Sequence, residues 1–180
     1  FSSGRSPELQ RGNGVAPTLT ISKSACQSDT HGISRSEDRS ENERAAQTYN
    51  RARMERMLKA TRRAEDEHFW FIGLRRTARQ LLDASLSGRR LERIIDCGAG
   101  TGRNLQWLEA YGEAIGVELT AFGAGAGRSM GRTMVRGSVA ALPFPDASAD
   151  LATSFDVLYC LDDATETKAI GEMWRVLRPG

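Results

Sequence analysis

The sequence predicts an α/β fold in which a parallel sheet of about four strands is covered by helices on both faces. Three observations predict it. Between residues 89 and 180, short apolar segments typical of strands alternate with segments of helical periodicity. Glycines stand at the junctions between these segments. The most glycine-rich junction, residues 98–102, directly follows an apolar segment that ends in an acidic residue, Asp96.

The periodicity places the expected elements along this part of the chain. Strands are expected near residues 94–95, 114–119, 133–136 and 150–155, and helices over residues 104–111, 121–130 and 164–177. Strands that alternate with helices form parallel sheets of the Rossmann-like type. Ligands of such sheets bind outside the carboxyl ends of the strands, so we expect the chemistry at that edge.

Two segments precede this domain of residues 89–180. Residues 1–42 are rich in Ser, Gly and Arg and have no periodicity, so they cannot bury enough apolar surface to fold, and we expect disorder. Residues 43–88 are expected to form N-terminal helices, with Leu74, Ala78, Leu81 and Leu82 on one apolar stripe. The stretch 64–71 changes abruptly from charged to aromatic residues. It indicates either two helices that meet at a bend or one long helix that docks at its centre.

Composition excludes several classes of protein. Lys and Arg total 25 against 23 Asp and Glu, so electrostatics gives no indication of nucleic acid or a membrane as a partner. The three cysteines lie far apart and match neither a disulfide framework nor a metal spacing. The sequence has no apolar run long enough to span a membrane and no signal-peptide core. We expect a cytoplasmic protein whose partner is a small molecule.

The glycine-rich junction has the spacing GxGxG at Gly98, Gly100 and Gly102. Enzymes that bind nicotinamide dinucleotides use GxGxxG, and the third glycine of that motif would fall on Arg103. This departure favours an adenosyl ligand without a pyrophosphate. Glu118 follows 16 residues beyond Gly102, at the end of the next strand, where a carboxylate can accept hydrogen bonds from both ribose hydroxyls. The alternative is a solvated surface glutamate.

Four motifs in order resemble the class I S-adenosylmethionine-dependent methyltransferases, especially those that act on small molecules and lipids. The motifs cover residues 94–102, 116–118, 136–146 and 175–180, about half of the chain. The resemblance implies S-adenosylmethionine as the cofactor and methyl transfer to a small-molecule or lipid acceptor. A non-catalytic methyltransferase-like scaffold and an NAD-dependent oxidoreductase remain as alternatives.

The resemblance also implies roles for individual residues. The turn would lie along the methionine part of the cofactor, with Asp96 near its amino group, Glu118 on the ribose and Leu119 on the adenine. Ser138 stands where the family often has an aspartate for the adenine amino group, and a hydroxyl accepts that bond more weakly. The implied cofactor residues are Asp96, Gly98, Ala99, Gly100, Gly102, Glu118, Leu119, Ser138, Val139, Phe71 and Arg75.

Phe71 and Arg75 belong to an N-terminal segment that is similar to a cofactor-covering helix of some of these enzymes. An aromatic ring can lie against a sulfonium, and an arginine can pair with the methionine carboxylate. The alternative is that Phe69, Trp70 and Phe71 only dock this helix on the sheet. His68 is expected to cap the helix or to lie in the core.

We assign no catalytic residue and no metal ligand. Methyl transfer depends mainly on proximity and alignment, so a general base is not obligatory. Asp156 and Tyr159, beyond the fourth strand, are candidates only, and Cys160 stands where many relatives have a histidine. Trp107, Cys97 and Cys160 are expected to be buried core residues.

The chain starts at Phe1 and stops at Gly180, after a turn that should lead into another strand, so it reads as a fragment. The family fold has seven strands, of which about four are recognisable here. We therefore expect this chain to bind the cofactor weakly or not at all and to transfer no methyl group.

Overall fold

The computed structural model describes residues 52–179 and shows a four-stranded parallel sheet. The strands are β1 (Arg93–Cys97), β2 (Glu113–Glu118), β3 (Thr133–Arg136) and β4 (Leu151–Thr153), in the order β3-β2-β1-β4. In this register Asp96 of β1 lies beside Gly116 of β2 and Thr153 of β4. The predicted fold class is confirmed.

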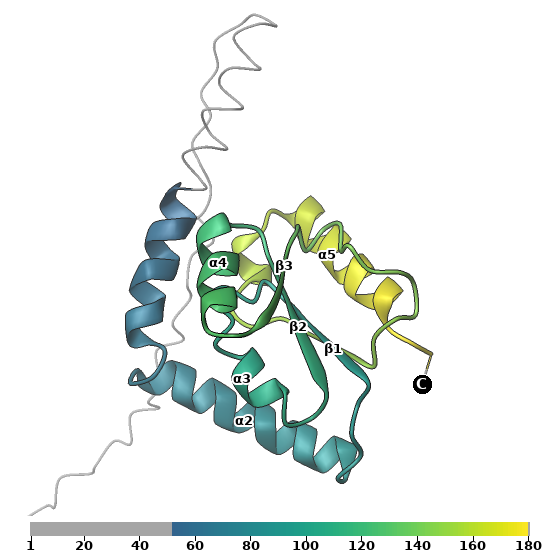
Figure 1. The fold of residues 1–180 in the computed structure, drawn as a ribbon. Helices are drawn as coiled ribbons and strands as arrows, with labels where there is room; N and C mark the ends of the chain where they lie inside the picture. Colours follow the sequence, from purple (N-terminus) through teal and green to yellow (C-terminus); the bar gives the residue numbers. More distant parts are fainter. Residues whose placement is uncertain (1–51, 180) are drawn as a thin grey trace, which may run out of the picture.

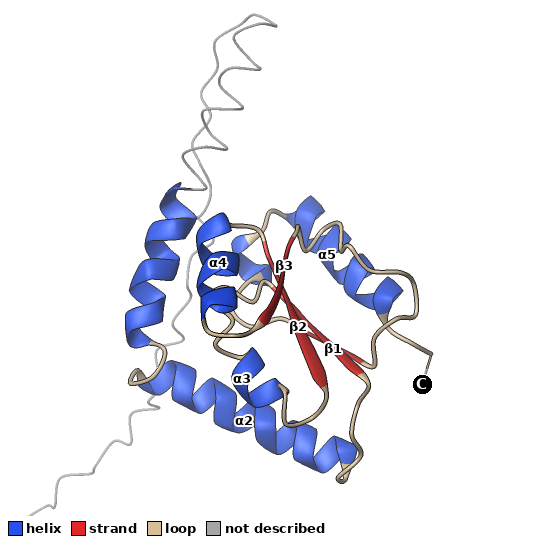
Figure 2. Ribbon diagram, in the orientation of Figure 1, coloured by secondary structure: helices blue, strands red, loops and turns tan. Residues whose placement is uncertain are grey.

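Helices cover both faces of the sheet (Figures 1 and 2). A helix over residues 52–64 bends into the next helix at residues 65–68, which confirms the first of the two alternatives for this segment. The further helices are α2 (Phe69–Leu86), α3 (Leu105–Leu108), α4 (Ala121–Ser129), the short 3-10 helix η2 (Leu158–Cys160) and α5 (Asp163–Val176).

The strands divide their apolar residues between two core clusters. Ile94 packs in the cluster that α2 and α3 cover, while its neighbour Ile95 packs in the cluster that α5 covers. This alternation follows from the period of two of a strand and explains why β1 is apolar on both faces. Trp107 is buried in the first cluster and Cys97 in the second, as predicted.

Several sequence expectations need correction. The helix expected over residues 104–111 is only the four-residue α3, because its flanking residues form turns. Leu81 was expected on the buried stripe of α2 but is exposed, while Leu82 packs against the core. Cys160 was expected in the core but lies in the short helix η2, which has no buried residue, and is only partly buried. The prediction of disorder for residues 1–42 concerns residues outside the described part.

The chain after α5 returns to the sheet beside β4. Leu177 forms a parallel bridge with Ala149, and the amide of Arg178 donates to the Ala149 carbonyl at 2.9 Å. Among the described strands, β4 pairs with β1 on its other side. Because all four strands are parallel, their carboxyl ends lie together at one edge of the sheet.

Candidate functional site

The glycine turn joins β1 to α3 at the carboxyl edge of the sheet. Gly98, Gly100 and Gly102 have φ angles of 82°, 56° and 77°, a region that residues with a side chain rarely adopt. The amides of Gly98 and Ala99 donate to the Val117 carbonyl at 2.8 and 2.9 Å, which fixes the turn to β2. A Cβ atom at Gly98 would lie 2.4 Å from Cγ2 of Val157. The turn is therefore both firmly anchored and closely packed.

Glu118 ends β2 and holds the turn from the side. Its side chain is 5% exposed, so the alternative of a solvated surface glutamate is wrong. One carboxylate oxygen accepts from the Gly100 amide at 3.1 Å, and the other accepts from the amide and hydroxyl of Thr120, both at 2.7 Å. The carboxylate thus links the turn to the start of α4.

Thr120 and Gly123 complete this arrangement and were not predicted as site residues. The Thr120 hydroxyl caps α4 by accepting from the Gly123 amide at 3.0 Å. A Cβ atom at Gly123 would lie 2.6 Å from the Gly100 carbonyl oxygen, so glycine lets α4 approach the turn. A threonine directly before the helix expected over residues 121–130 is an N-cap pattern that was available in the sequence.

Asp96 lies at the floor of the site, with its side chain 1% exposed. Its Oδ1 accepts from the Thr153 hydroxyl at 2.8 Å, whereas its buried Oδ2 has no partner among residues 52–179. Burial raises the pKa of Asp96 to about 7, although the Thr153 hydrogen bond acts in the opposite direction. Asp96 is therefore a buried carboxyl group with one free acceptor, a suitable partner for a cationic group.

Burial also raises the pKa of the neighbouring Cys97 thiol to about 12, with a smaller contribution from the charge of Asp96. A thiol with such a pKa is protonated at neutral pH, and only the thiolate is a strong nucleophile. The prediction that Cys97 is a packing residue is confirmed by its burial.

Ser138 and Val139 lie in the loop that follows β3. The Ser138 hydroxyl accepts from the Ala140 amide at 3.2 Å, and Ser138 forms an isolated bridge with Ala141. Val139 packs against the second core cluster. The loop is thus a tight local turn beside the end of β2, while the adenine contact of Ser138 and Val139 stays a prediction.

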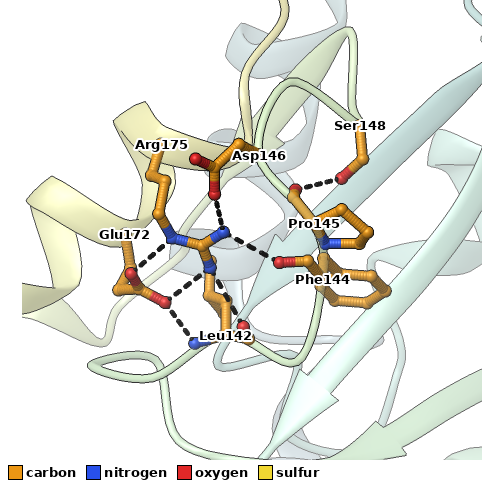
Figure 3. Close-up of polar contacts among 7 residues, drawn as sticks. All are labelled: Leu142, Phe144, Pro145, Asp146, Ser148, Glu172 and Arg175. Atoms are coloured by element: carbon orange, nitrogen blue, oxygen red, sulfur yellow. Dashed lines mark hydrogen bonds and ion pairs between the residues drawn. The ribbon is translucent and has the colours of Figure 1, made fainter.

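The guanidinium of Arg175 on α5 fixes the next part of this loop (Figure 3). It donates to the carbonyls of Leu142 and Phe144 at 3.1 and 2.9 Å and pairs with Asp146 at 2.6 Å. Glu172 accepts from Arg175 at 2.7 Å and from the Leu142 amide at 2.6 Å. The structure therefore joins two of the four sequence motifs, residues 136–146 and 175–180, in one structural contact.

The bend before α2 covers the glycine turn. Glu65 accepts from the Thr101 hydroxyl at 3.0 Å, and Asp66 accepts from Arg103 Nε at 2.6 Å. Burial raises the pKa of Glu65, and the Thr101 hydrogen bond opposes this shift. Leu58 lies against the turn, since a Cβ atom at Gly100 would be 3.2 Å from its side chain. We call residues 58–70 the cover segment.

The aromatic residues at the start of α2, Phe69, Trp70 and Phe71, do not simply dock this helix on the sheet. Phe69 is 77% exposed, and the Trp70 indole donates to the Asp156 carboxylate at 3.0 Å. Phe71 is half-buried beside the ring of His68, and Arg75 donates to the Glu65 carbonyl at 2.7 Å. His68 caps α2 through its ring nitrogen, one of the two expected roles. Cofactor contacts of Phe71 and Arg75 stay predictions.

The segment after β4 forms the other end of the edge. The Ser154 hydroxyl donates to the Cys97 carbonyl at 3.0 Å, and Asp156 has a φ of 57°, unusual for a residue with a side chain. Tyr159 is exposed. Residues 154–160 contain no histidine, so this segment offers Asp156 and Tyr159 as its titratable oxygen groups.

Two further properties concern residues 52–179 as a whole. In this range we find no group of three or more His, Cys, Asp or Glu side chains that could hold a metal ion. No helix of the same range is both long and apolar enough to cross a membrane.

Comparison with known proteins agrees with this geometry. Residues 95–180 match the family model described as a methyltransferase domain. No curated protein matches the chain significantly. The structure is similar to the N-methyltransferase NodS from Bradyrhizobium japonicum in complex with S-adenosyl-L-homocysteine, with 20% identity, a TM-score of 0.56, and coverage of 64% of this chain and 61% of NodS.

Two further solved structures share the fold. A putative S-adenosyl-L-methionine-dependent methyltransferase from Methanococcus maripaludis has 16% identity and a TM-score of 0.57 over 72% of this chain and 60% of its own. The [4+2]-cyclase SpnF has 22% identity and a TM-score of 0.53 over 63% of this chain and 44% of its own. The chain thus spans 44% to 61% of these three proteins. Residues 95–180 thus match a methyltransferase domain, and the part of the chain that the structure describes shares the Rossmann-like fold of these solved structures.

Proposed function

We propose that this chain is the cofactor-binding part of an S-adenosylmethionine-dependent methyltransferase that acts on a small-molecule acceptor. The observation that carries the proposal is the buried Glu118 carboxylate, which accepts from the Gly100 amide at 3.1 Å and so joins the GxGxG turn to the end of β2. A turn without a third glycine at position 103 and a carboxylate beside it suit an adenosyl group.

The residues present fit this cofactor. The unpartnered Oδ2 of Asp96 is a buried acceptor for the ammonium group of the methionine part. The Glu118 oxygens keep lone pairs for ribose hydroxyls, because a carboxylate offers about four acceptor positions and three are used within the chain. The exposed side chain of Leu119 is free to cover an adenine. The backbone of Gly98 to Gly102 leaves room for close approach.

When bound, S-adenosylmethionine supplies an electrophilic methyl group on a sulfonium. The chain's residues bind and align the reactants: the turn and Glu118 hold the cofactor, and the cover segment keeps water from the turn through Glu65 and Leu58. Asp156 and Tyr159 lie at the end of the edge where we place the acceptor. We assign no general base, since alignment accounts for the catalysis.

Ligand-detected saturation-transfer NMR tests the cofactor assignment, because it reports weak binding. We expect a signal for S-adenosylmethionine and S-adenosylhomocysteine that is stronger than any signal for NAD. Glu118→Gln should weaken it on the order of tenfold, since the uncharged amide is a poorer acceptor for two ribose hydroxyls. The exposed Glu113→Gln on the same strand is the matched control.

Two outcomes would overturn the proposal. Stronger binding of NAD than of S-adenosylmethionine would indicate the oxidoreductase alternative. An equal signal from the wild-type chain and the Glu118→Gln variant would show that the cofactor does not bind at the end of β2.

A further inference from the structure

Positive charge is concentrated on the helix over residues 52–64. This helix contains five basic residues and one acidic residue, Glu55. The basic residues are Arg53, Arg56, Lys59, Arg62 and Arg63. The two acidic groups that follow, Glu65 and Asp66, contact Thr101 and Arg103 instead of this helix. Glu65 and Asp66 thus form no ion pair with Lys59, Arg62 or Arg63.

Three of these cations border one hollow. A cavity of about 400 Å³ is lined by Lys59, Arg62, Arg63 and Phe122. Phe122 is the second residue of α4, which lies alongside the basic helix (Figure 1). The Lys59 Nζ atom is 5.1 Å from the centre of the Phe122 ring. Within residues 52–179, none of the three cations forms an ion pair with a carboxylate.

The chemistry of this lining selects its ligand. Like charges around one hollow repel each other, and an anion that contacts all of them relieves the repulsion. A phosphate group carries up to two charges and several acceptor oxygens, and arginine matches its geometry with two parallel hydrogen bonds. A single carboxylate has fewer charges to share among three cations. The Phe122 ring adds an apolar wall on which an organic group can lie.

We propose that the hollow between the basic helix and α4 binds the phosphate group of a small organic phosphate. Lys59, Arg62 and Arg63 contact the phosphate, and Phe122 packs against the organic part. This site differs from the turn at Gly98–Gly102, so a phosphate can bind there in the absence of the proposed cofactor. The hollow is open to solvent, but its concave shape and aromatic wall suit a small ligand, whereas a flat basic face would suit a membrane surface better.

The hollow borders the candidate cofactor site on two sides. Leu58, which precedes Lys59, lies against Gly100, and Phe122 follows Glu118 by four residues. A ligand that bridges the basic helix and α4 would therefore hold the cover segment on the glycine turn. Phosphate binding and cofactor binding would then strengthen each other by the same factor, as linkage requires.

Isothermal titration calorimetry of the 180-residue chain with phenyl phosphate and with inorganic phosphate, at constant ionic strength, tests the proposal. We expect phenyl phosphate to bind more tightly than inorganic phosphate. The variant K59A/R62A/R63A should bind both at least about tenfold more weakly, because each lost charged contact contributes about that factor. The control K168A/R89A/R90A removes the same residue types from exposed positions elsewhere and should bind like the wild type.

Phe122→Ala separates the two halves of the proposal. It should remove the preference for phenyl phosphate and leave the affinity for inorganic phosphate unchanged. Equal binding of both ligands by the wild type would overturn the organic part. Equal weakening by the site variant and its control, or no binding at all, would overturn the site. Co-sedimentation with phosphatidylserine vesicles that phenyl phosphate does not reverse would assign the basic helix to a membrane surface instead.

Discussion

The two ends of the carboxyl edge of the sheet differ in how firmly their side chains are held. At the β1–β2 end, Glu118 is buried and makes three hydrogen bonds, and the glycine turn is anchored to Val117. At the β4 end, residues 154–160 are only partly buried or exposed, and the Trp70 contact on Asp156 comes from the cover segment. The half proposed for the cofactor is therefore held by contacts within the sheet domain, whereas the half proposed for the acceptor is also held by a contact from the cover segment.

Gly98→Ala should have the largest effect, because it strains the firm end directly. A φ of 82° is unfavourable for alanine, and the added Cβ atom would lie 2.4 Å from Val157 Cγ2. We expect the free energy of unfolding to fall by roughly 2–5 kcal/mol, measured by urea denaturation. Gly125→Ala is the matched control, since an added Cβ meets nothing within 4 Å there. A fall no larger than in the control would show that the turn is not rigid.

The ionisation of Asp96 should give the next largest effect. Burial raises its pKa in the folded chain to about 7, above the ordinary value of 3.8, so the folded state favours the neutral acid. The contribution of protonated Asp96 to the free energy of unfolding is complete below about pH 4 and is lost as the pH rises through about 7. Relative to Asp96→Asn, the wild type should lose roughly 2–4 kcal/mol of unfolding free energy over this range. Parallel pH profiles of the two proteins would contradict the buried, unpartnered carboxyl group.

Arg175→Met should have a smaller, local effect on the loop over residues 142–146. Arg175→Met keeps the length of the side chain but removes its contacts with Glu172, Asp146 and two loop carbonyls. We expect hydrogen exchange of the Leu142 amide to accelerate on the order of tenfold, because its acceptor Glu172 loses its partner. Arg178→Met, which breaks a comparable contact with Glu92, is the control and should leave this amide unchanged.

The β1–β2 end of the sheet edge could be predicted from the sequence better than the β4 end, for a physical reason. Local rules determine the turn: a strand, three glycines and an acid at the next strand end are each readable from spacing, as is the burial of Trp107. The contacts that Thr153, Arg175 and Trp70 make join residues 29 to 86 positions apart. Such pairs depend on how the elements pack, which periodicity does not specify.

The same limit explains the misplaced residues of α2. The stripe of Leu74, Ala78, Leu81 and Leu82 is readable as one apolar face, yet the helix presents only part of it to the core and leaves Leu81 exposed. The orientation of a helix around its axis depends on the neighbouring elements. The contacts of Glu65 and Asp66 with the turn, made from the bend at residues 65–68, are of the same kind and are not readable from periodicity.

Trp70→Phe should have the smallest effect, and it tests whether the cover segment holds the segment after β4. The substitution keeps an aromatic ring but removes the indole donor to Asp156, an exposed hydrogen bond worth about 1 kcal/mol. We expect hydrogen exchange of residues 154–160 to accelerate by about twofold to fivefold, with little change in the melting temperature. Trp174→Phe, at a site 80% exposed on α5, is the matched control and should leave this segment unchanged. If both variants exchange like the wild type, the β4 end is held without the cover segment and the contrast between the two ends is wrong. If only Trp70→Phe accelerates exchange, then Asp156 owes its conformation, with a φ of 57°, to a residue 86 positions away.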